Sequence, residues 1–490
     1  MAESAGLKVK KSENFSEWFT QICLENGAQL VDIRYNVQGF IVHRPWGFKI
    51  LRRIYELFEK AVEEDSHEPY LFPNVIPEEN LQKEAEHAGF IPDVFWVTKA
   101  GTETLEKPWA LRPTGETQIY PMYSLWLRSY NDLPFKFYQS RLMSYRNEKT
   151  TRPFLRGREF MFFETHDVFA KHEEAMAQIK KDMEIMEDVV RKKLKIPFLF
   201  FRRPQWDKFK GANDTYASDV IMPDGRRNQM SSTHDLGQNF AKAFDIKFKD
   251  FDGQDKYGWQ TCFGPGIWRI MAGLIAVHGD DTGLVLPFDL APLKVIIIPI
   301  TFSKKEEDNK KVIDKCKEIE KKIKELGFTV KVDDSDATPG YKYNHWEMFG
   351  VPLRIELGPR EADASKFTIA RRTDKKKETH DLKDLKNVIE QNAELLDAEI
   401  EKKSEEYFKE NAKEAKSFDE LKANIEKFRG FVKVPLCTIE MDGKSCGEKI
   451  KEETTADICG TLFGKEEKPH GNCIVCGKPA KAMVYIAKSI

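Results

Sequence analysis

One stretch of the sequence constrains the fold of this chain more than any other. It reads Arg146-x-Glu148 and then, after a short loop, Arg156-x-x-x-Phe160-x-x-x-Glu164. This order predicts two neighbouring strands joined by a charged loop. An isolated Arg-x-Glu is most simply a salt-bridged surface pair, but the Arg-x-x-x-Phe-x-x-x-Glu that follows favours a binding site instead.

Length and charge leave several functions open. A chain of 490 residues with 41% hydrophobic content predicts two to four domains. The net charge of −2 is the balance of 78 basic and 80 acidic residues, so local patches of either sign remain compatible with an RNA partner. The first fifteen residues lack the apolar run of a signal peptide, and no apolar run is long enough to span a bilayer. We therefore expect a cytoplasmic protein that does not span a membrane.

The character of the sequence divides the chain into three parts. Residues 1–290 are rich in aromatics, with β-like and helical stretches in irregular order, which predicts a large α+β domain. Residues 291–400 alternate strand, helix and strand, which is typical of a compact α/β domain with a mixed sheet. Residues 401–490 begin with a charge-dense, helical stretch up to about residue 428 and continue into a cysteine-rich tail.

The elements of the second part can be placed by periodicity. A helix is expected over 304–326, because apolar residues recur along one face, and Gly327 is well placed to end it. Strands are expected at 295–300, 328–332, 352–357 and 367–370, with helices at 343–348 and from about 382.

The pattern from Arg146 to Glu164 resembles motif 2 of the class II aminoacyl-tRNA synthetases. In that chemistry an amino-acid carboxylate attacks the α-phosphorus of ATP, so negative charge builds on oxygens that a fixed guanidinium can neutralise. The resemblance implies that Arg146 bridges carboxylate and α-phosphate through a planar fork that lysine lacks. It also implies that Glu148 accepts from the adenine amino group and that Arg156 holds the outer phosphates.

Two further stretches resemble the other motifs of this class. Residues 264–268, Gly-Pro-Gly-Ile-Trp, precede Arg269 and an apolar stretch, 270–277, that predicts a buried helix. By itself this is a glycine turn before a core helix; as a match to motif 3 it implies that Arg269 reaches ATP. Residues 47–64 followed by Pro73 resemble motif 1, which implies a homodimer.

Several blocks resemble one family within the class, the prolyl-tRNA synthetases, from about Phe15 to the C-terminus. They are 83–87 leading to 96–98, 112–117 (Arg-Pro-Thr-Gly-Glu-Thr), 234–240, 278–281 (His-Gly-Asp-Asp), 283–287, 338–340 and 350–356 (Gly-Val-Pro-Leu-Arg-Ile-Glu). The resemblance implies a class II antiparallel-sheet catalytic domain, an α/β anticodon-binding domain and a small zinc-binding α/β C-terminal domain. No large insertion separates motifs 2 and 3, so the editing domain of the bacterial-type enzymes is not expected.

The same resemblance assigns the residues of the active site. The catalytic residues would be Arg146 and Arg269, and ATP would contact Arg146, Glu148, Arg156, Gln229, Ser232 and Arg269. Proline would contact Thr114, Glu116, Arg146, Phe160, Phe162, His166 and His234, with an acid placed to orient its imino group. Ordinary core packing is the alternative for the aromatics.

The chain departs from the family pattern at four places. It has Phe162-Phe163 where Trp-Gln is common and Ser231-Ser232-Thr233-His234 where Gly-Thr-Ser-His is common. It carries one extra residue between Gly264 and Arg269. Many members end in a tyrosine carboxylate near the active site, whereas this chain ends Ser489-Ile490, so that contact is not expected.

Anticodon contacts and a metal are also implied. Reading unpaired bases needs hydrogen bonds to base edges and stacking, and Lys342, Glu347 and Arg354 are candidates, with plain surface charge as the alternative. Five of the eight cysteines lie in the last 54 residues, and a C-x-x-C followed by glycine suits tetrahedral thiolate zinc. The predicted ligands of a structural Zn²⁺ are Cys437, Cys446, Cys473 and Cys476, with Cys459 as a possible replacement.

The sequence therefore predicts an enzyme that joins proline to tRNA(Pro) with ATP and Mg²⁺ through a prolyl adenylate. Two alternatives remain open. A related class II ligase could use its altered pocket to select another amino acid, or a noncatalytic paralogue could bind tRNA without activating any amino acid. The four charged ATP-site residues argue against the second alternative, because a binding module would not require them all.

Overall fold

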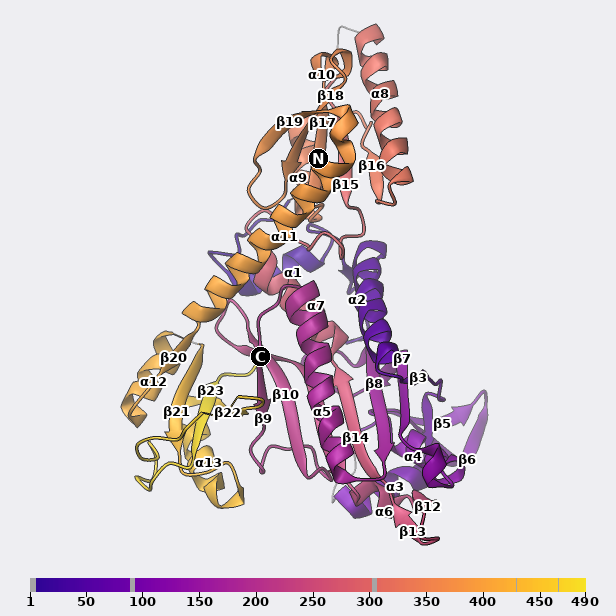
Figure 1. Ribbon diagram of the computed structural model, residues 1–490, viewed down its shortest axis with the longest axis vertical. Helices are drawn as coiled ribbons and strands as arrows, with labels where there is room; N and C mark the ends of the chain where they lie inside the picture. Colours follow the sequence, from indigo (N-terminus) through magenta and orange to yellow (C-terminus); the bar gives the residue numbers. More distant parts are fainter. Residues whose placement is uncertain (1–5, 89–92, 302–305, 429, 466) are drawn as a thin grey trace.

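The computed structural model describes residues 6–88, 93–301, 306–428, 430–465 and 467–490. Figure 1 shows a broad lower part built on one large sheet, a smaller upper domain, and the long helix α11 (Leu385–Glu410) running between the upper domain and the C-terminal elements. Among the described residues, no helix is both long and apolar enough to cross a membrane.

The lower part is organised by an eleven-stranded sheet in the order β20-β21-β23-β22-β9-β10-β11-β14-β8-β7-β3. Pairing is antiparallel except for the two outermost pairs, β20 with β21 and β3 with β7. The catalytic-domain strands are β3 (Glu68–Pro69), β7 (Phe135–Tyr145), β8 (Glu159–Phe169), β9 (Leu199–Arg202), β10 (Asp214–Ile221), β11 (Arg227–Gly237) and β14 (Trp259–Pro265). The antiparallel α+β architecture expected for residues 1–290 is confirmed.

Three helices cover the sheet: α2 (Pro45–Glu64), α5 (His172–Met186) and α7 (Ile267–His278) (Figure 1). The side of α2 that carries Ile50, Ile54 and Phe58 is fully buried, so α2 packs one apolar face against the core. Nearly all of α7 is buried, so the buried helix predicted over 270–277 is confirmed. A helix buried on all sides holds its first turn rigidly against the sheet.

Smaller elements surround this core. They are α1 (Phe15–Cys23), β1 (Val31–Asp32), β2 (Val42–His43), β4 (Val75–Pro77), α3 (Glu78–Ala88), β5 (Trp96–Ala100), β6 (Glu103–Leu111), α4 (Glu116–Trp126), a 3₁₀ turn (Tyr130–Asp132), a π-helical segment (Glu187–Lys193), α6 (Asn239–Ala243), β12 (Lys247–Lys249) and β13 (Asp255–Tyr257).

The upper domain has a five-stranded mixed sheet in the order β16-β15-β17-β18-β19. The sequence predicts a mixed sheet with four of these strands and does not predict β19. Its elements are β15 (Val295–Pro299), α8 (Glu306–Glu325), β16 (Val330–Val332), α9 (Pro339–Met348), β17 (Leu353–Leu357), α10 (Pro359–Asp363), β18 (Lys366–Arg371), β19 (Lys377–Asp381) and a 3₁₀ turn (Leu382–Asp384) before α11. The apolar face predicted for α8 is buried, and Gly327 follows it with a φ of +85°; residues 304 and 305 lie outside the described ranges.

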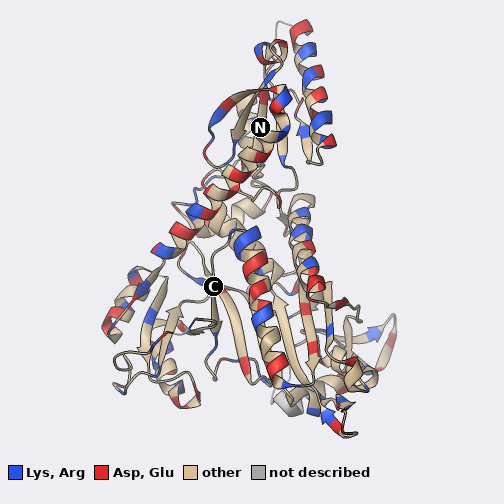
Figure 2. Cartoon of the chain, viewed as in Figure 1, with Lys and Arg blue, Asp and Glu red and all other residues tan. Residues whose placement is uncertain are grey.

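The C-terminal region differs from the expectation in two respects. The charge-dense stretch is not one helix: α11 ends at Glu410, β20 (Ala412–Glu414) follows, and α12 covers Phe418–Lys427. Both charge signs alternate along α8 and α11, as expected for solvated helix faces (Figure 2). Because α11 is continuous across residue 400, the predicted domain boundary there falls inside a helix.

The cysteine-rich tail also joins the catalytic sheet. It contains β21 (Phe431–Leu436), a 3₁₀ turn (Met441–Gly443), α13 (Lys444–Thr454), β22 (Asp457–Leu462) and β23 (Ala482–Ala487). Strand β22 pairs with β9, so Thr461 lies opposite Arg202 and Leu462 opposite Phe201. The tail is therefore an extension of the catalytic sheet.

Candidate active site

The charged hairpin lies at the ends of β7 and β8, where the two strands separate. Tyr145 still pairs with Glu159, and the backbone N–H of Arg146 donates to the Arg158 carbonyl at 3.0 Å. Glu148 lies between two guanidinium groups, 4.0 Å from Arg146 and 3.7 Å from Arg156. The Arg146 side chain is 60% exposed, so it remains available to a ligand.

Arg269 adds a third cation in the first turn of α7. The turn before it is tight: the N–H of Gly266 donates to the Met230 carbonyl at 2.7 Å, and a Cβ at Gly266 would lie only 3.2 Å from that oxygen. Burial, together with the nearby charges of Arg156 and Arg146, lowers the pKa of Arg269 to about 10. Three like charges near a helix N-terminus create a site that favours an anion.

All predicted ATP-binding residues line a single cavity of ≈350 Å³. They are Arg146, Glu148, Arg156, Gln229, Ser232 and Arg269. Phe160 and Phe162 form part of its wall, with ring centroids 6.0 Å apart, and Trp268 stands 6.4 Å from Phe160. An aromatic wall opposite converging arginines is suited to a planar base attached to a polyphosphate.

The other residues predicted to contact proline are Thr114, Glu116, His166 and His234, which do not line that cavity. Glu116 and His166 belong to a buried polar cluster that includes Glu164. Glu164 accepts from Arg112, accepts from Gln139 at 2.5 Å and lies 3.1 Å from His166 Nε2. Burial alone would raise the pKa of Glu164, but Arg112 and His166 outweigh it and hold the pKa at about 2. Burial works against protonation of His166, yet Glu164 raises its pKa above the usual value.

The pKa of His234 is shifted in the opposite direction to that of His166. Burial and the neighbouring His166 lower its pKa to about 3, so this imidazole is neutral. Its Nδ1 lies 3.0 Å from Thr215 Oγ1, and its ring lies 4.6 Å from that of Phe209. The pKa values of two histidines predicted for one pocket thus shift in opposite directions, because His166 has the Glu164 carboxylate as a partner and His234 is next to the Thr215 hydroxyl.

Several buried polar atoms around this cluster have no hydrogen-bond partner in the described part of the chain. The atom most relevant to function is Glu116 Oε2, and the others include atoms of Arg112, Thr117, Thr165, Thr233 and Gln260. Buried polar groups are normally paired, so a concentration of unpaired ones indicates space for a polar ligand or water.

Glu116, His166 and Cys262 also place their ligand atoms within 4.8 Å of one another. Both nitrogens of His166 are already engaged, Nδ1 with the Tyr120 hydroxyl at 3.0 Å and Nε2 with Glu164. Burial raises the pKa of the Cys262 thiol well above its usual value. These three side chains therefore fit a substrate pocket better than a metal centre.

The end of the chain reaches this site, which the sequence did not predict. The Ile490 carbonyl accepts from Arg156 Nη2 at 2.9 Å, and its N–H donates to the Arg227 carbonyl at 3.2 Å. Nothing in the sequence indicated this contact, because Ile490 stands where many family members have a tyrosine. The backbone after β23 brings the terminus here, and the Ile490 side chain packs against the catalytic core.

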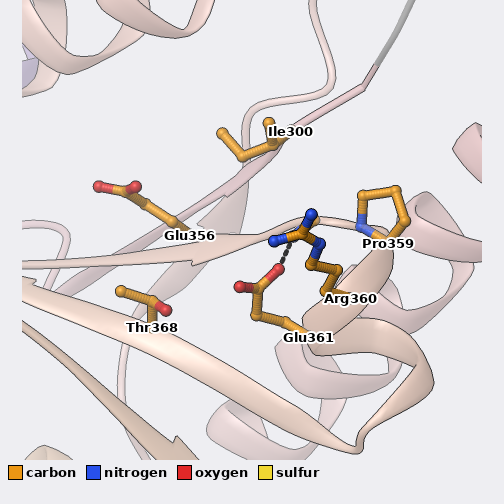
Figure 3. A pocket seen from close by; sticks show the side chains of 7 residues that line it. Ile300, Glu356, Pro359, Arg360, Glu361 and Thr368 are labelled. Carbon is orange, nitrogen blue, oxygen red and sulfur yellow. Dashed lines mark hydrogen bonds between the residues drawn. The ribbon is translucent and has the colours of Figure 1, made fainter.

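The three predicted anticodon residues are not free surface charges. Arg354 donates to Glu347 at 2.8 Å and to Glu356 at 3.0 Å, while the Lys342 ammonium donates to the Asp333 carbonyl at 2.9 Å. A pocket of ≈500 Å³ opens beside this network, lined by Ile300, Glu356, Gly358, Pro359, Arg360, Glu361 and Thr368. Arg360 and Glu361 point toward one another at its mouth, and sequence reasoning missed both (Figure 3).

The four predicted zinc ligands gather in one cluster in the C-terminal region. The Sγ of Cys446 lies 3.7 Å from that of Cys437 and 4.0 Å from that of Cys473, and Cys476 completes the group. A tetrahedron of sulfurs at ~2.3 Å from zinc has edges of ~3.8 Å, so the spacing fits. The pKa of Cys476 is lowered to about 7, chiefly by the backbone N–H of Lys478. Cys459 lies apart, buried among Phe201, Ile221 and Phe431.

Family comparisons agree with this architecture. Residues 95–278 match the model of the tRNA synthetase class II core domain (G, H, P, S and T), and residues 294–392 match an anticodon binding domain. Together with the antiparallel sheet and its arginine-lined cavity, these matches define a class II aminoacyl-tRNA synthetase.

The particular family follows from three further comparisons. Residues 418–490 match the prolyl-tRNA synthetase C-terminal model. The chain is 51% identical to a proline–tRNA ligase of Thermofilum pendens, with 99% of each chain covered, and 40% identical to one of Methanopyrus kandleri, with 97% and 96% covered. The Giardia lamblia prolyl-tRNA synthetase in complex with prolyl-adenylate superposes with a TM-score of 0.94 at 36% identity, covering 99% of this chain and 100% of that one. The chain belongs to the proline–tRNA ligase family.

Proposed function

We propose that this protein activates L-proline with ATP to prolyl adenylate and transfers the prolyl group to the 3′ end of tRNA(Pro). The observation that carries the proposal has two parts: three arginines converge on a cavity beside Glu148, and the buried Glu116 carboxylate has an oxygen, Oε2, with no hydrogen-bond partner among the described residues. The first suits a nucleoside triphosphate, and the second suits a small cationic amine.

In the first step a carboxylate oxygen of proline attacks the α-phosphorus, and pyrophosphate leaves. Arg146 and Arg269 neutralise the charge that builds on the phosphoryl oxygens, while Arg156 holds the departing phosphates. Mg²⁺ would arrive bound to the ATP phosphates and offset part of their charge. In the second step a ribose hydroxyl of the terminal adenosine attacks the adenylate carbonyl, and AMP leaves.

Proline recognition rests on charge and on shape. The imino group of proline is a secondary ammonium, which donates two hydrogen bonds, and Glu116 Oε2 offers a buried acceptor without another partner. Thr114, His166 and His234 are proposed to complete this pocket, and Phe160 and Phe162 to contact the pyrrolidine ring. The Glu164 carboxylate in this cluster stays ionised because Arg112 stabilises its negative charge.

The test is amino-acid-dependent pyrophosphate exchange with all twenty amino acids, on the wild type and on Glu116→Gln. We expect proline alone to drive exchange. The variant should raise the KM for proline by about 10- to 100-fold, because a charge-assisted hydrogen bond contributes ~1.5–3 kcal/mol, and leave the KM for ATP unchanged. Glu103→Gln, at an exposed position of β6, is the matched control.

Other outcomes distinguish the alternatives. If another amino acid drives exchange faster than proline, the departures at Phe163 and before Arg269 define a different specificity. If no amino acid drives exchange, the chain binds tRNA without activating an amino acid.

The upper domain is proposed to bind the tRNA anticodon. Its match to an anticodon-binding model and the pocket beside the Glu347–Arg354–Glu356 network support this role. Carboxylates and guanidinium groups held in a fixed array can pair with the edges of unpaired bases. Because Lys342 is tied to a backbone carbonyl, we propose Arg360 and Glu361 as additional contacts, testable by binding of an anticodon stem-loop to Arg360→Ala.

A structural Zn²⁺ is proposed at the four-cysteine cluster. One equivalent of zinc per chain is expected by elemental analysis, and Cys473→Ala should lose it, because three thiolates do not complete the tetrahedral set. Cys459→Ala is the matched control, since it removes an equally buried thiol outside the cluster and should keep the zinc. Zinc retained by Cys473→Ala and lost from Cys459→Ala would refute the assignment.

A homodimer is also proposed. Large hydrophobic side chains stay exposed near the motif 1 helix and across the nearby strands, among them Tyr35, Val42, Phe48, Leu71, Trp96 and Trp109. Clustered exposed aromatic and aliphatic residues of this kind mark protein interfaces. Sedimentation equilibrium should give twice the chain mass of 56.8 kDa.

A further inference from the structure

The joint between the upper domain and the catalytic domain includes two sequence blocks that the proposed active site does not use. One is the His-Gly-Asp-Asp segment 278–281 at the end of α7, and the other is the end of α9 with the residues that follow it. The Leu284 N–H donates to the Met348 carbonyl at 3.1 Å. Gly283 has a φ of +150°, and any Cβ there would overlap the Met348 backbone. The close approach of these two segments therefore requires glycine.

Arg372 lies at the centre of this joint and is almost completely buried, with 1% of its side chain exposed. Its two terminal nitrogens donate to the Asp280 carboxylate at 2.7 and 2.6 Å, and its Nε donates to the Glu347 carbonyl at 2.9 Å. Burial would raise the pKa of Asp280, but Arg372 and Thr282 hold it at about 2. Arg372 and Asp280 thus form a bidentate guanidinium–carboxylate pair across the domain boundary.

The elements that Arg372 connects lead to the predicted ATP site and to the predicted anticodon contacts. Asp280 follows the C-terminal end of α7, whose first turn carries Arg269. Glu347 lies in the last turn of α9, the helix that also carries Lys342. Met348, the last residue of α9, and Phe349 pack into the core of the catalytic domain. One side chain therefore ties the helix of the ATP site to the helix of the anticodon candidates.

We propose that Arg372 is a positioning residue that fixes the anticodon-binding domain relative to the active site, so that one tRNA engages both at once. This inference rests on the proposed function. When two binding sites are held rigidly, the second contact becomes intramolecular and has a high effective concentration. Loosening the joint reduces that advantage. It leaves each separate site intact.

The experiment measures three reactions of Arg372→Ala. We expect proline-dependent pyrophosphate exchange, which needs no tRNA, to stay within about twofold of wild type. Charging of full-length tRNA(Pro) should fall about tenfold in kcat/KM, within the usual range of coupling between sites. Charging of an RNA hairpin that contains only the acceptor stem should not change, because the hairpin never reaches the upper domain.

Further variants test the geometry. Arg372→Lys should lie between alanine and wild type, because an ammonium cannot donate the parallel pair of bonds to Asp280. The double variant Arg372→Ala with Asp280→Ala should charge full-length tRNA no worse than Arg372→Ala alone. Glu401→Gln is the matched control: it removes the charge of Glu401, which is exposed on α11 and lies 2.9 Å from the partly buried Lys195, and should leave all three reactions unchanged.

Two results would overturn the proposal. If exchange and hairpin charging fall in parallel with full-length charging, Arg372 only maintains the catalytic domain. If full-length charging is unchanged, the apolar contacts and the Trp46 Nε1 bond to the Phe349 carbonyl at 3.0 Å position the domains by themselves. If no amino acid supports exchange even in the wild type, the proposed function fails first, and that result is separate from both.

Discussion

Arg146→Ala is expected to lower the kcat of proline-dependent pyrophosphate exchange by about 10²–10³-fold, the usual cost of removing one donor that stabilises transition-state charge. Arg146 is exposed to the cavity, and Glu148, its acidic neighbour among the described residues, stands 4.0 Å away, so its guanidinium remains available to carboxylate and phosphate. Because Arg146 acts on developing charge, kcat should fall more than the KM for ATP rises.

The control is Arg141→Ala, on β7, the strand that ends just before Arg146. Arg141 donates to Glu59 at 2.8 and 2.7 Å and is not among the residues that line the ATP cavity. Its removal should leave exchange unchanged. Arg146→Lys should recover little activity, because lysine keeps the charge and loses the planar fork. Full activity in Arg146→Ala would transfer the catalytic role to Arg269.

Asp219→Ala is expected to destabilise the folded chain by about 3–5 kcal/mol, the usual cost of removing one member of a buried ionic network. Asp219 accepts from Arg203 at 2.8 and 2.7 Å and from Arg227 at 3.0 Å, and its side chain is fully buried. Its loss leaves two buried guanidinium groups without their carboxylate. Urea unfolding followed by tryptophan fluorescence measures the effect.

The same network joins the C-terminal region to the catalytic sheet. Arg203 also donates to the Cys459 carbonyl at 2.7 Å, and the backbone of Arg227 pairs with Lys488 and Ile490. Burial would raise the pKa of Asp219, but the two arginines keep it below the usual value. Its contribution is therefore fully present above about pH 4 and is lost as the pH falls through the folded pKa.

Glu25→Ala is the control for this measurement. Glu25 forms an exposed pair with Arg34, and such pairs contribute little, so the unfolding midpoint should not move. An equal shift in both variants would show that Asp219 is no more important than a surface carboxylate.

Much of the fold could be predicted because its periodicities are local. The buried helix after Arg269 is apolar on every side, and the apolar residues of α8 recur at helical spacing. The burial of each helix could therefore be predicted from its own residues. The stretch 404–428 was harder. Its charges suit any solvated helix, and only the pairing of β20 with β21 shows that the helix is interrupted.

Arg146, Glu148, Arg156 and Arg269 could be predicted as a group because they lie in short motifs around one hairpin and one glycine turn. Gln229 and Ser232, on β11, were predicted only from the family resemblance. The buried cluster around Glu164 could not be predicted. Its partners Arg112, Gln139 and His166 come from different segments, and the pKa values of Glu164 and His166 depend on burial and contacts that residue spacing does not predict. The contact between Ile490 and Arg156 also joins remote segments, so local spacing does not predict it.

Local sequence by itself determined which charged residues line one cavity, which four cysteines share one cluster, and where the buried helix after Arg269 and most elements of the upper domain lie. The tertiary structure alone decided that Arg372 joins Asp280 to the Glu347 carbonyl, that Glu116 keeps an unpaired oxygen, and that the tail extends the catalytic sheet. The physical reason is distance along the chain. Spacing sets contacts within a helix or hairpin, whereas burial and pairing between remote segments exist only once the chain has folded.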